Sequence, residues 1–342
     1  MRVLQAMAGA PHGGAEAFFE RLVVALNNAG LEQKVVIRKD PARAERLRGG
    51  GVEVTQLPFG GLLDFCTPFA LKKITRTYRP DVVLTWMNRA TRLMPAGDYR
   101  FVARLGGYYD LKYYRRCDHL IGNTRDIVDY LIGQGWPADR ASHVPNFVSA
   151  ETAPPIARSN HSTSDDVPLI LSLGRLHRNK AFDVLLDALA SVPNAVLWLA
   201  GEGPERGALQ AQADQLGVAD RIRFLGWRQD VAALMATCDV YVCPSRHEPL
   251  GNVVLEAWAA SRPIVAAASQ GPSVLIDDGV SGLLAAVGSA PELAAQINRV
   301  ISDRGLASEL AANGHRGFKA KFTEQAVVNL YMDFFNRLME AR

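Results

Sequence analysis

The amino-acid sequence predicts an α/β protein with two doubly wound domains. Short apolar runs alternate with helical patterns along all 342 residues, an alternation typical of parallel sheets covered by helices. The alternation runs through two series, residues 1–148 and 168–322, and each is long enough for one domain of about 150 residues. A polar stretch at 149–167 separates the two series.

The first series predicts strands and helices in turn. Strands are expected at 2–8, 33–37, 52–57, 82–86, 100–105, 119–122 and 142–144. The first helix is expected at 15–29, because Phe18, Leu22 and Leu26 recur at helical spacing and Gly30 ends the pattern. Two further helices are expected at 67–78 and 125–134.

The second series repeats this rhythm. Strands are expected at 168–173, 196–200, 222–225, 240–243, 263–267 and 282–285, with helices between them, one of which covers 253–260. The stretch 149–167 contains no apolar run and is rich in Pro, Ser, Asp and Asn, which is the composition of a linker. Residues 323–342 predict a final helix with one apolar face.

Composition excludes several classes of protein. With 48% hydrophobic and 21% charged residues, the chain is neither disordered nor fibrous. No run of about 18 apolar residues predicts a membrane span. The four cysteines form no CxxC pair, which indicates reduced thiols in a cytoplasmic protein.

Charge is distributed unevenly along the chain. Residues 1–150 carry 21 Lys and Arg against 14 Asp and Glu, a net +7, whereas the remainder carries 17 against 21, a net −4. A basic first half indicates an anionic partner such as phosphate, nucleic acid or lipid headgroups, or it serves solubility alone.

The segment 244–256 carries the strongest chemical signal. It connects the strand 240–243 to the helix 253–260, and in an open α/β sheet ligands bind at such strand ends. Gly251, between Leu250 and Asn252, allows close backbone approach, and the helix start offers unpaired N–H groups to an anion. Glu248 and Glu256 lie in position to face the same cleft.

A second strand end carries two cations. Gly174 ends a strand, and Arg175 and Lys180 follow before the next helix begins. Cations at a helix N-terminus are unfavourable for the helix dipole. Their placement is explained if a diphosphate binds between them, and the alternative is a pair of solvated surface cations.

Glycine turns follow two further strands. Gly13 and Gly14 follow the first strand, where they could cradle a phosphate or simply form a tight turn. Gly201 and Gly203, with Gly207, make a motif one residue too long for the dinucleotide fingerprint, so a nicotinamide site is not expected. No Asp-x-Asp pair, zinc motif, P-loop or RNA-binding signature occurs, so neither a metal nor nucleic acid is expected.

These motifs, in this order, resemble the E-x7-E family of retaining GT-B glycosyltransferases, the bacterial group 1 family that includes lipopolysaccharide-core and mannosyl transferases. The signature itself runs from Glu248 to Glu256. The resemblance covers nearly the whole chain, from the turn at 13–16, through 145–146, 174–180, 201–204 and Gly226, to the tail at 277–282. Ala181 stands where the family usually has glycine, and 106–110 replaces the family's His-Asp.

The resemblance implies two Rossmann-like domains facing a cleft, with the C-terminal helix crossing back to the N-terminal domain. It implies that Arg175 and Lys180 neutralise a leaving diphosphate and that Glu248 holds sugar hydroxyls, and it makes these three the catalytic candidates. The candidate donor-binding residues are Gly13, Gly14, Gly174, Gly201, Gly203, Gly226, Leu250, Gly251, Asn252 and Glu256. The candidate acceptor-side residues are His12, Glu16, Asp110 and Asn146.

The expected activity is therefore metal-independent, retaining transfer of a hexose from a nucleotide-diphosphate sugar to a glycan or lipid-linked acceptor, in lipopolysaccharide or other surface-polysaccharide biosynthesis. No cofactor is expected. Two alternatives stay open: a GT-B sugar-nucleotide epimerase or hydrolase, and a non-catalytic nucleotide-sugar-binding partner. The basic clusters at 72–79 and 112–116 also indicate an anionic membrane surface as a partner, which would place the protein at the inner face of the plasma membrane.

Overall fold

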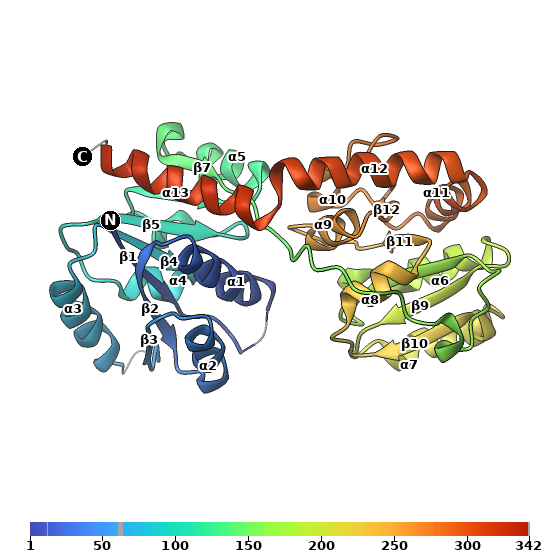
Figure 1. Cartoon of the computed structure of the whole chain (residues 1–342), viewed down its shortest axis with the longest axis horizontal. Helices are drawn as coiled ribbons and strands as arrows, with labels where there is room; N and C mark the ends of the chain where they lie inside the picture. Colours follow the sequence, from blue (N-terminus) through green and yellow to red (C-terminus); the bar gives the residue numbers. More distant parts are fainter. Residues whose placement is uncertain (12, 61–63, 341–342) are drawn as a thin grey trace. The chain divides into compact units, whose positions relative to one another are not determined.

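The computed structural model describes residues 1–11, 13–60 and 64–340 and divides the chain into two compact units. Unit 1 comprises Met1–Asn146 together with Glu324–Arg342, and unit 2 comprises Phe147–Thr323. Both chain termini therefore belong to unit 1 (Figure 1). No helix in the described ranges is long and apolar enough to cross a membrane.

Unit 1 is built on a seven-stranded parallel sheet with the order β3-β2-β1-β4-β5-β6-β7. Its central strands are buried along nearly their whole length, as expected for a parallel sheet covered on both faces. Its strands are β1 (Arg2–Met7), β2 (Glu32–Arg38), β3 (Val54–Leu57), β4 (Val82–Trp86), β5 (Arg100–Leu105), β6 (His119–Gly122) and β7 (Ala141–His143).

Unit 2 repeats this topology with a six-stranded parallel sheet of order β10-β9-β8-β11-β12-β13. The strand order reverses between β8 and β11, and such a reversal is where doubly wound folds bind ligands. Its strands are β8 (Leu169–Leu173), β9 (Val196–Ala200), β10 (Ile222–Gly226), β11 (Val240–Cys243), β12 (Ile264–Ala267) and β13 (Leu283–Ala285).

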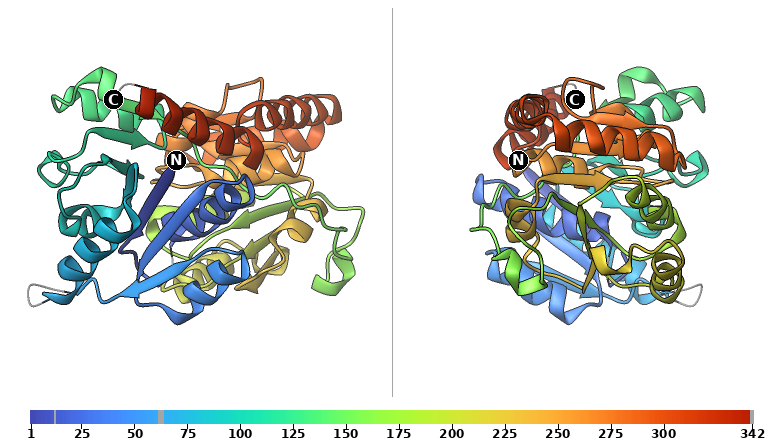
Figure 2. Two further views of the ribbon diagram at one scale, coloured as in Figure 1. Left: turned by 60° about the vertical axis from the view of Figure 1, so that its left-hand side comes forward. Right: turned by 90° about the vertical axis from the view of Figure 1, so that its right-hand side faces the viewer.

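Helices connect the strands and pack against the sheet of their own unit or, like α12 on α9 and α11, against other helices (Figures 1 and 2). The α-helices are α1 (Gly14–Asn28), α2 (Pro41–Gly49), α3 (Cys66–Tyr78), α4 (Met87–Leu93), α5 (Arg125–Gly133), α6 (Phe182–Ala190), α7 (Arg206–Gln215), α8 (Val231–Thr237), α9 (Asn252–Ala259), α10 (Gln270–Leu275), α11 (Ala290–Ser302), α12 (Arg304–Lys321) and α13 (Glu324–Glu340). Short 3-10 helices are η1 (Leu111–Tyr113), η2 (Ala138–Arg140), η3 (Arg158–His161), η4 (Arg178–Lys180) and η5 (Ala219–Arg221).

Residues 149–167, which we expected to link the domains, lie within unit 2 and are bound to it. The Ile156 N–H donates to the Thr237 hydroxyl at 2.8 Å. The Trp198 indole donates to the Thr163 hydroxyl at 2.9 Å, and Thr163 is only 5% exposed. These hydrogen bonds attach the stretch to the rest of unit 2.

The last helix, α13, packs on unit 1. The guanidinium of Arg104, on β5, lies 4.6 Å from the rings of both Phe18 and Trp86 and donates to the Tyr331 hydroxyl of α13 at 2.8 Å. The ring of Phe334 meets His119 of β6 edge-on at 5.0 Å. These contacts make α13 part of the unit 1 core.

Candidate active site

Four loops follow neighbouring strands at one edge of the unit 2 sheet, and together they form what we call the strand-end site. The loops contain Gly174 to Lys180 after β8, Gly201 to Gly203 after β9, Trp227 after Gly226 at the end of β10, and Pro244 to Gly251 after β11. The strand order β10-β9-β8-β11 places the four loops side by side. Segments up to 77 positions apart in sequence are therefore adjacent in the fold.

Glycines allow these loops to pack backbone against backbone. The Gly174 N–H donates to the Ala200 carbonyl at 3.0 Å, and the Gly201 N–H donates to the Gly226 carbonyl at 2.8 Å. A Cβ on Gly201 would overlap the Gly174 carbonyl oxygen, and one on Gly203 would overlap the Leu176 carbonyl oxygen. Gly201 also has φ 144°, which side chains rarely adopt. Both glycines are therefore required by the fold of the site.

The ammonium of Lys180 pairs directly with the carboxylate of Glu248. The Glu248 side chain is 11% exposed and that of Lys180 25% exposed. The Ser245 hydroxyl lies 3.4 Å from the same carboxylate oxygen, and the His247 N–H donates to the Asn179 carbonyl at 3.1 Å. The site thus holds a cation and a carboxylate in contact at the switch point of the sheet.

The loop after β11 turns at Gly251, whose φ of 66° is in the left-handed region that favours glycine. A Cβ there would lie 2.9 Å from a methyl carbon of Leu275. The turn begins α9 at Asn252, and Glu256 lies partly buried in the second turn of that helix. Leu250, before the turn, is also partly exposed.

Sequence reasoning missed Gly271, which supports this turn from α10. The Gly271 N–H donates to the Glu248 carbonyl at 2.7 Å, and a Cβ on Gly271 would lie 2.6 Å from the Gly251 nitrogen. Its signal was a Ser-Gln-Gly-Pro segment directly after the buried strand β12. The absence of a side chain at Gly271 therefore lets α10 hydrogen-bond directly to the backbone of Glu248.

The other cations of the site divide into paired and unpaired ones. Arg246 forms a two-pronged ion pair with Asp183 at 2.7 and 2.6 Å, which holds the pKa of that carboxyl below its usual range and ties the β11 loop to α6. Arg175 is exposed, and no side chain in the described part of the chain pairs with it. Arg175 is therefore available to an anion.

Trp227 is a second residue that sequence reasoning missed. It directly follows Gly226 on the β10 loop, and its side chain is 74% exposed. Gly226 has φ 67°, and a Cβ on it would lie 3.1 Å from a carboxylate oxygen of Glu202. An aromatic ring exposed at a strand carboxyl end is the signal that could have found it.

In unit 1, the carboxylate of Glu16 occupies the glycine turn after β1. Glu16 is 6% exposed and accepts a hydrogen bond from the Ala10 N–H at 2.7 Å. A Cβ on Gly13 would overlap a carboxylate oxygen of Glu16, whereas one on Gly14 would meet nothing. Gly13 therefore makes room for Glu16. His12 lies outside the described residues.

The other acceptor-side candidates lie in different surroundings. Asp110 is exposed and caps η1, where hydrogen bonds from Lys112 hold its pKa below the usual range. Asn146 is 4% exposed, and its amide oxygen accepts from Arg104. Asn146 therefore supports the buried guanidinium, and Asp110 lies at the surface.

Asn123, which sequence reasoning also missed, follows β6 directly and is 4% exposed. Within the part of the chain that the structure describes, neither atom of its amide has a hydrogen-bond partner. Buried amides are nearly always paired. Gly106, after the neighbouring strand β5, is close enough that a Cβ there would lie 3.4 Å from the Asn123 nitrogen.

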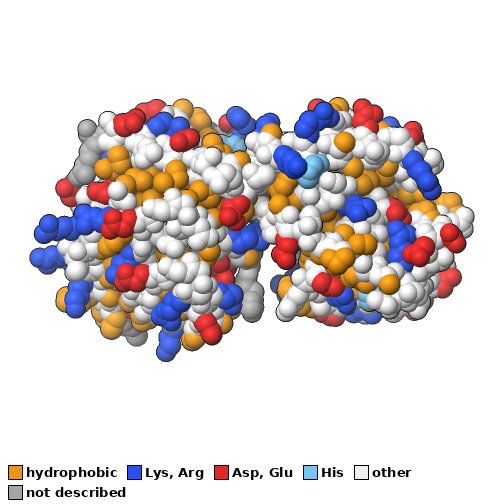
Figure 3. Space-filling model, viewed as in Figure 1, with side chains coloured by type: hydrophobic (Ala, Val, Ile, Leu, Met, Phe, Trp, Pro, Cys, Tyr) orange, Lys and Arg blue, Asp and Glu red, His pale blue; other side chains and the backbone are white. Residues whose placement is uncertain are grey.

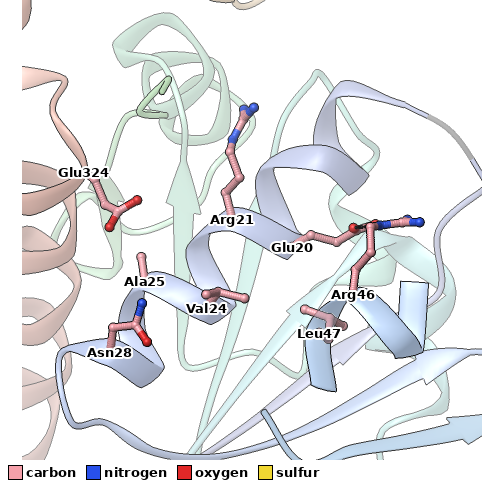
Figure 4. A pocket seen from close by; sticks show the side chains of 8 residues that line it. All are labelled: Glu20, Arg21, Val24, Ala25, Asn28, Arg46, Leu47 and Glu324. Atoms are coloured by element: carbon pink, nitrogen blue, oxygen red, sulfur yellow. Dashed lines mark hydrogen bonds and ion pairs between the residues drawn. The ribbon is translucent and has the colours of Figure 1, made fainter. Parts of the chain in front are cut away.

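Unit 1 also carries a groove of about 290 Å³ between α1, α2 and the start of α13 (Figure 4). Its central carboxylate, Glu20, is already held by Arg43 at 2.8 Å and Arg46 at 2.7 Å. None of the catalytic, donor-binding or acceptor-side candidates predicted from the sequence lines this groove. It is therefore separate from the candidate site.

Groups that could bind a metal or act as a nucleophile are sparse. Among the described residues, no three His, Cys, Asp or Glu side chains gather closely enough to hold a metal ion. Cys243 lies below the Glu248 loop, but burial raises the pKa of its thiol to about 11, so it stays protonated. The chemistry available at the strand-end site is therefore electrostatic and hydrogen-bonding.

Two doubly wound units, with paired charges and glycine loops at the strand ends of the second, are the architecture of the GT-B glycosyltransferases. Residues 155–317 match the family Glycosyl transferases group 1, and residues 12–152 match Glycosyltransferase Family 4. The chain therefore belongs to the group 1 glycosyltransferases.

Two relatives from Rhizobium meliloti (strain 1021) support this assignment over nearly the whole chain. The lipopolysaccharide core biosynthesis glycosyltransferase LpsE is 37% identical over 325 residues, which are 94% of this chain and 95% of LpsE. The lipopolysaccharide core biosynthesis glycosyltransferase LpsD is 36% identical over 329 residues, 95% of each chain. The family predicted from the sequence is confirmed.

Solved structures share the fold. A glycosyltransferase from Rickettsia africae ESF-5 matches with a TM-score of 0.89 at 16% identity, over 100% of this chain and 99% of that one. Anabaena Alr3699/HepE, in complex with UDP, matches with a TM-score of 0.84 at 22% identity, over 98% and 100% of the two chains. The predicted GT-B fold is confirmed as well.

Proposed function

We propose that this glycosyltransferase moves a hexose from a nucleotide-diphosphate sugar to a glycan or lipid-linked acceptor, with retention at the anomeric carbon and without a metal. The names of LpsE and LpsD support a place in lipopolysaccharide core or related surface-polysaccharide biosynthesis. The complexes of Alr3699/HepE with UDP and with UDP-glucose support a nucleotide sugar as the donor.

The pairing of Lys180 with Glu248 is the observation that carries the proposal. An ammonium has three N–H donors, so Lys180 can keep one on Glu248 and offer the others to phosphate oxygens. Arg175 adds a second positive charge from the same loop. Such fixed charges stabilise a departing diphosphate, a role that a bound metal plays in other enzymes.

In the proposed reaction the bond between the anomeric carbon and the diphosphate oxygen breaks, and the acceptor oxygen forms its bond on the same face of the sugar. The acceptor proton passes to the departing phosphate oxygen, so no protein nucleophile is assigned. Glu248 accepts hydrogen bonds from sugar hydroxyls, and Glu256 does so from the ribose.

The order of the strands suggests how the donor lies. Neighbouring strands are about 4.8 Å apart, so the loops after β10 and β11 are separated by roughly 14 Å. That distance is within the reach of a nucleotide sugar, with its phosphates at Lys180 and its base toward Trp227. A base stacked on an exposed aromatic ring gains about 1–3 kcal/mol.

On the acceptor side, we propose that Asn123 binds an acceptor hydroxyl, because its buried amide lacks a partner among the described residues. We also propose that the enzyme works in the cytoplasm. The four cysteines, all of which are free, support a reducing compartment.

A transfer assay tests the reaction. The purified protein is incubated with radiolabelled nucleotide sugars, with and without total membrane lipid, and in saturating EDTA. We expect label in the lipid fraction only when lipid is present, at an unchanged rate in EDTA, and with the anomeric configuration of the donor. Free sugar released equally without lipid would instead indicate a hydrolase or epimerase, and a rate abolished by EDTA and restored by Mg²⁺ would contradict the metal-free mechanism.

Tryptophan fluorescence tests the donor position independently. Trp227 is the exposed one of the five tryptophans, since Trp86, Trp136, Trp198 and Trp258 are at most 8% exposed. Iodide should therefore quench Trp227 selectively, and saturating uridine, guanosine or adenosine diphosphate should reduce that quenching for the base the enzyme uses. Trp227→Phe should remove the quenchable signal but retain binding. Quenching that no nucleotide changes would contradict a base at Trp227.

A further inference from the structure

Helix α3 of unit 1 presents an exposed face that changes from aromatic to basic along its length. Phe65, at the N-cap of the helix, and Phe69 are each 76% exposed. Lys72, Lys73 and Arg76 follow at helical spacing, and all three are exposed. The opposite face holds the helix on the unit through Thr67, Leu71 and Thr75, which are buried.

A hollow of about 460 Å³ adjoins this face. Phe65, Pro68 and Phe69 form its apolar side, and Lys72, Arg92 and Arg116 supply charge. Among the described residues, no acidic side chain lines it. The nearest carboxylate in sequence, Asp64, accepts hydrogen bonds from Thr67 and from the Gly60 N–H, so it is directed into the helix cap.

Phe65 and Phe69 lie in water beside cations that no carboxylate of the described residues pairs with, and this combination suits an amphipathic, anionic surface. Large aromatic side chains are seldom left this exposed unless they contact something. Phe65 and Phe69 are as apolar as lipid chains, and the cations beside them complement phosphate headgroups at the same level. Figure 3 shows hydrophobic and Lys or Arg side chains side by side on the edge of unit 1 that carries α3.

We propose that this surface docks the enzyme on an anionic phospholipid membrane. Phe65 and Phe69 enter the interface between headgroups and acyl chains, and the hollow lined by Lys72, Arg92 and Arg116 receives a lipid phosphate. This proposal goes beyond the proposed reaction and does not depend on the donor or acceptor.

Vesicle co-sedimentation of the full chain, without donor or acceptor, tests the proposal. Binding is expected to vesicles of phosphatidylcholine mixed with phosphatidylglycerol, to fall with added salt, and to be absent from pure phosphatidylcholine. Lys72→Ser with Arg92→Ser should weaken partitioning roughly 30-fold, since each cation near an anionic surface contributes about fivefold. Phe65→Ser with Phe69→Ser should weaken it at least about tenfold.

Matched control variants test whether vesicle binding depends on this surface or only on overall charge and hydrophobicity. Lys319→Ser with Lys321→Ser removes two exposed lysines of α12, and Ile132→Ser with Leu330→Ser removes two exposed apolar side chains of unit 1. Both pairs should bind vesicles like the parent chain. Equal loss in the control pairs, equal binding to neutral vesicles, or no vesicle binding by the parent chain would overturn the proposal. None of these outcomes bears on sugar transfer.

Discussion

Lys180 and Arg175 lie in one loop, and replacing either should reduce turnover, but only the loss of Lys180 should reduce stability. Lys180→Ala and Arg175→Ala should each reduce turnover on the order of 10²-fold or more, because each removes a fixed charge from the departing diphosphate. Lys180→Ala also leaves Glu248, 11% exposed, without its cation, so unfolding should become easier by roughly 1–3 kcal/mol. Arg175→Ala should change stability by less than about 0.5 kcal/mol.

Arg178→Ala is the matched control, since Arg178 is an exposed cation between these two whose backbone carbonyl accepts from Arg246 and from the Ala181 N–H, and its side chain pairs with no carboxylate of the described residues. It should keep both turnover and stability. Initial rates of sugar transfer and urea unfolding curves measure the two effects separately. If Lys180→Ala and Arg178→Ala proved equally active, the diphosphate role of Lys180 would be wrong.

At the scale of the element, the loop after β9 should tolerate no side chain where it crosses the β8 loop. Gly201→Ala or Gly203→Ala forces a Cβ against a carbonyl oxygen, so each should cost at least about 2–4 kcal/mol of unfolding free energy. Gly207→Ala, one helical turn later in α7, meets nothing within 4 Å and should gain roughly 0.5–1 kcal/mol. Calorimetry of the three variants checks this order, and a Gly201→Ala protein as stable as the parent would contradict it.

The contact between β6 and α13 should make unit 1 sensitive to mild acid. Burial lowers the pKa of His119 from 6.5 to about 4. The unfolded chain therefore takes up the proton first, and the stability contributed by neutral His119 is complete above about pH 6.5 and is lost as the pH falls toward 4. Between pH 7 and 5 the loss should be roughly 2 kcal/mol.

Urea unfolding at both pH values, for the parent and for His119→Gln, isolates this contribution. The variant cannot titrate, and its amide can still bond to the Ser142 hydroxyl, which lies 2.9 Å from the imidazole. The parent should lose more stability than the variant over this range. Identical losses would show that His119 carries no part of the acid sensitivity.

Helix α2 was not predicted from the hydrophobic pattern of the sequence. Only Arg43, Ala44 and Leu47 of its nine residues are buried, so no apolar stripe indicated a helix. Its signals were local: the Asp40 side chain caps the Arg43 N–H at 3.0 Å, and Pro41 opens the first turn. The strands were predictable because both faces of a parallel sheet are buried, which produces apolar runs.

The site was predictable in outline for a related reason. Strand carboxyl ends gather ligand-binding loops, so the rule placed Lys180 and Glu248 at one edge of the sheet. Their direct contact was not predictable, because it depends on the Gly251 turn and on Gly271 of α10 behind it. Ala181 could not be interpreted from the residue type alone. It adopts φ 53°, a left-handed conformation in which glycine is usual.

For the molecule as a whole, we expect unit 2 to fold when it is expressed without unit 1. Residues 147–323 form unit 2 without a break in the chain. Expressed alone, this fragment should fold and show nucleotide-dependent protection of Trp227 from iodide, but it should transfer no sugar because Asn123 belongs to unit 1. A fragment that fails to fold, while the full chain binds nucleotide, would show that unit 2 depends on unit 1.

Unit 1 is assembled from both ends of the chain, and this has a consequence for biosynthesis. At about 5–20 residues per second, a ribosome needs roughly 10–40 s to proceed from the end of the first segment at Asn146 to the end of α13. During that interval β5 and β6 lack Tyr331 and Phe334, the side chains that later contact Arg104 and His119. Unit 2 therefore has all of its residues before unit 1 does, although the sheet of unit 1 is translated first.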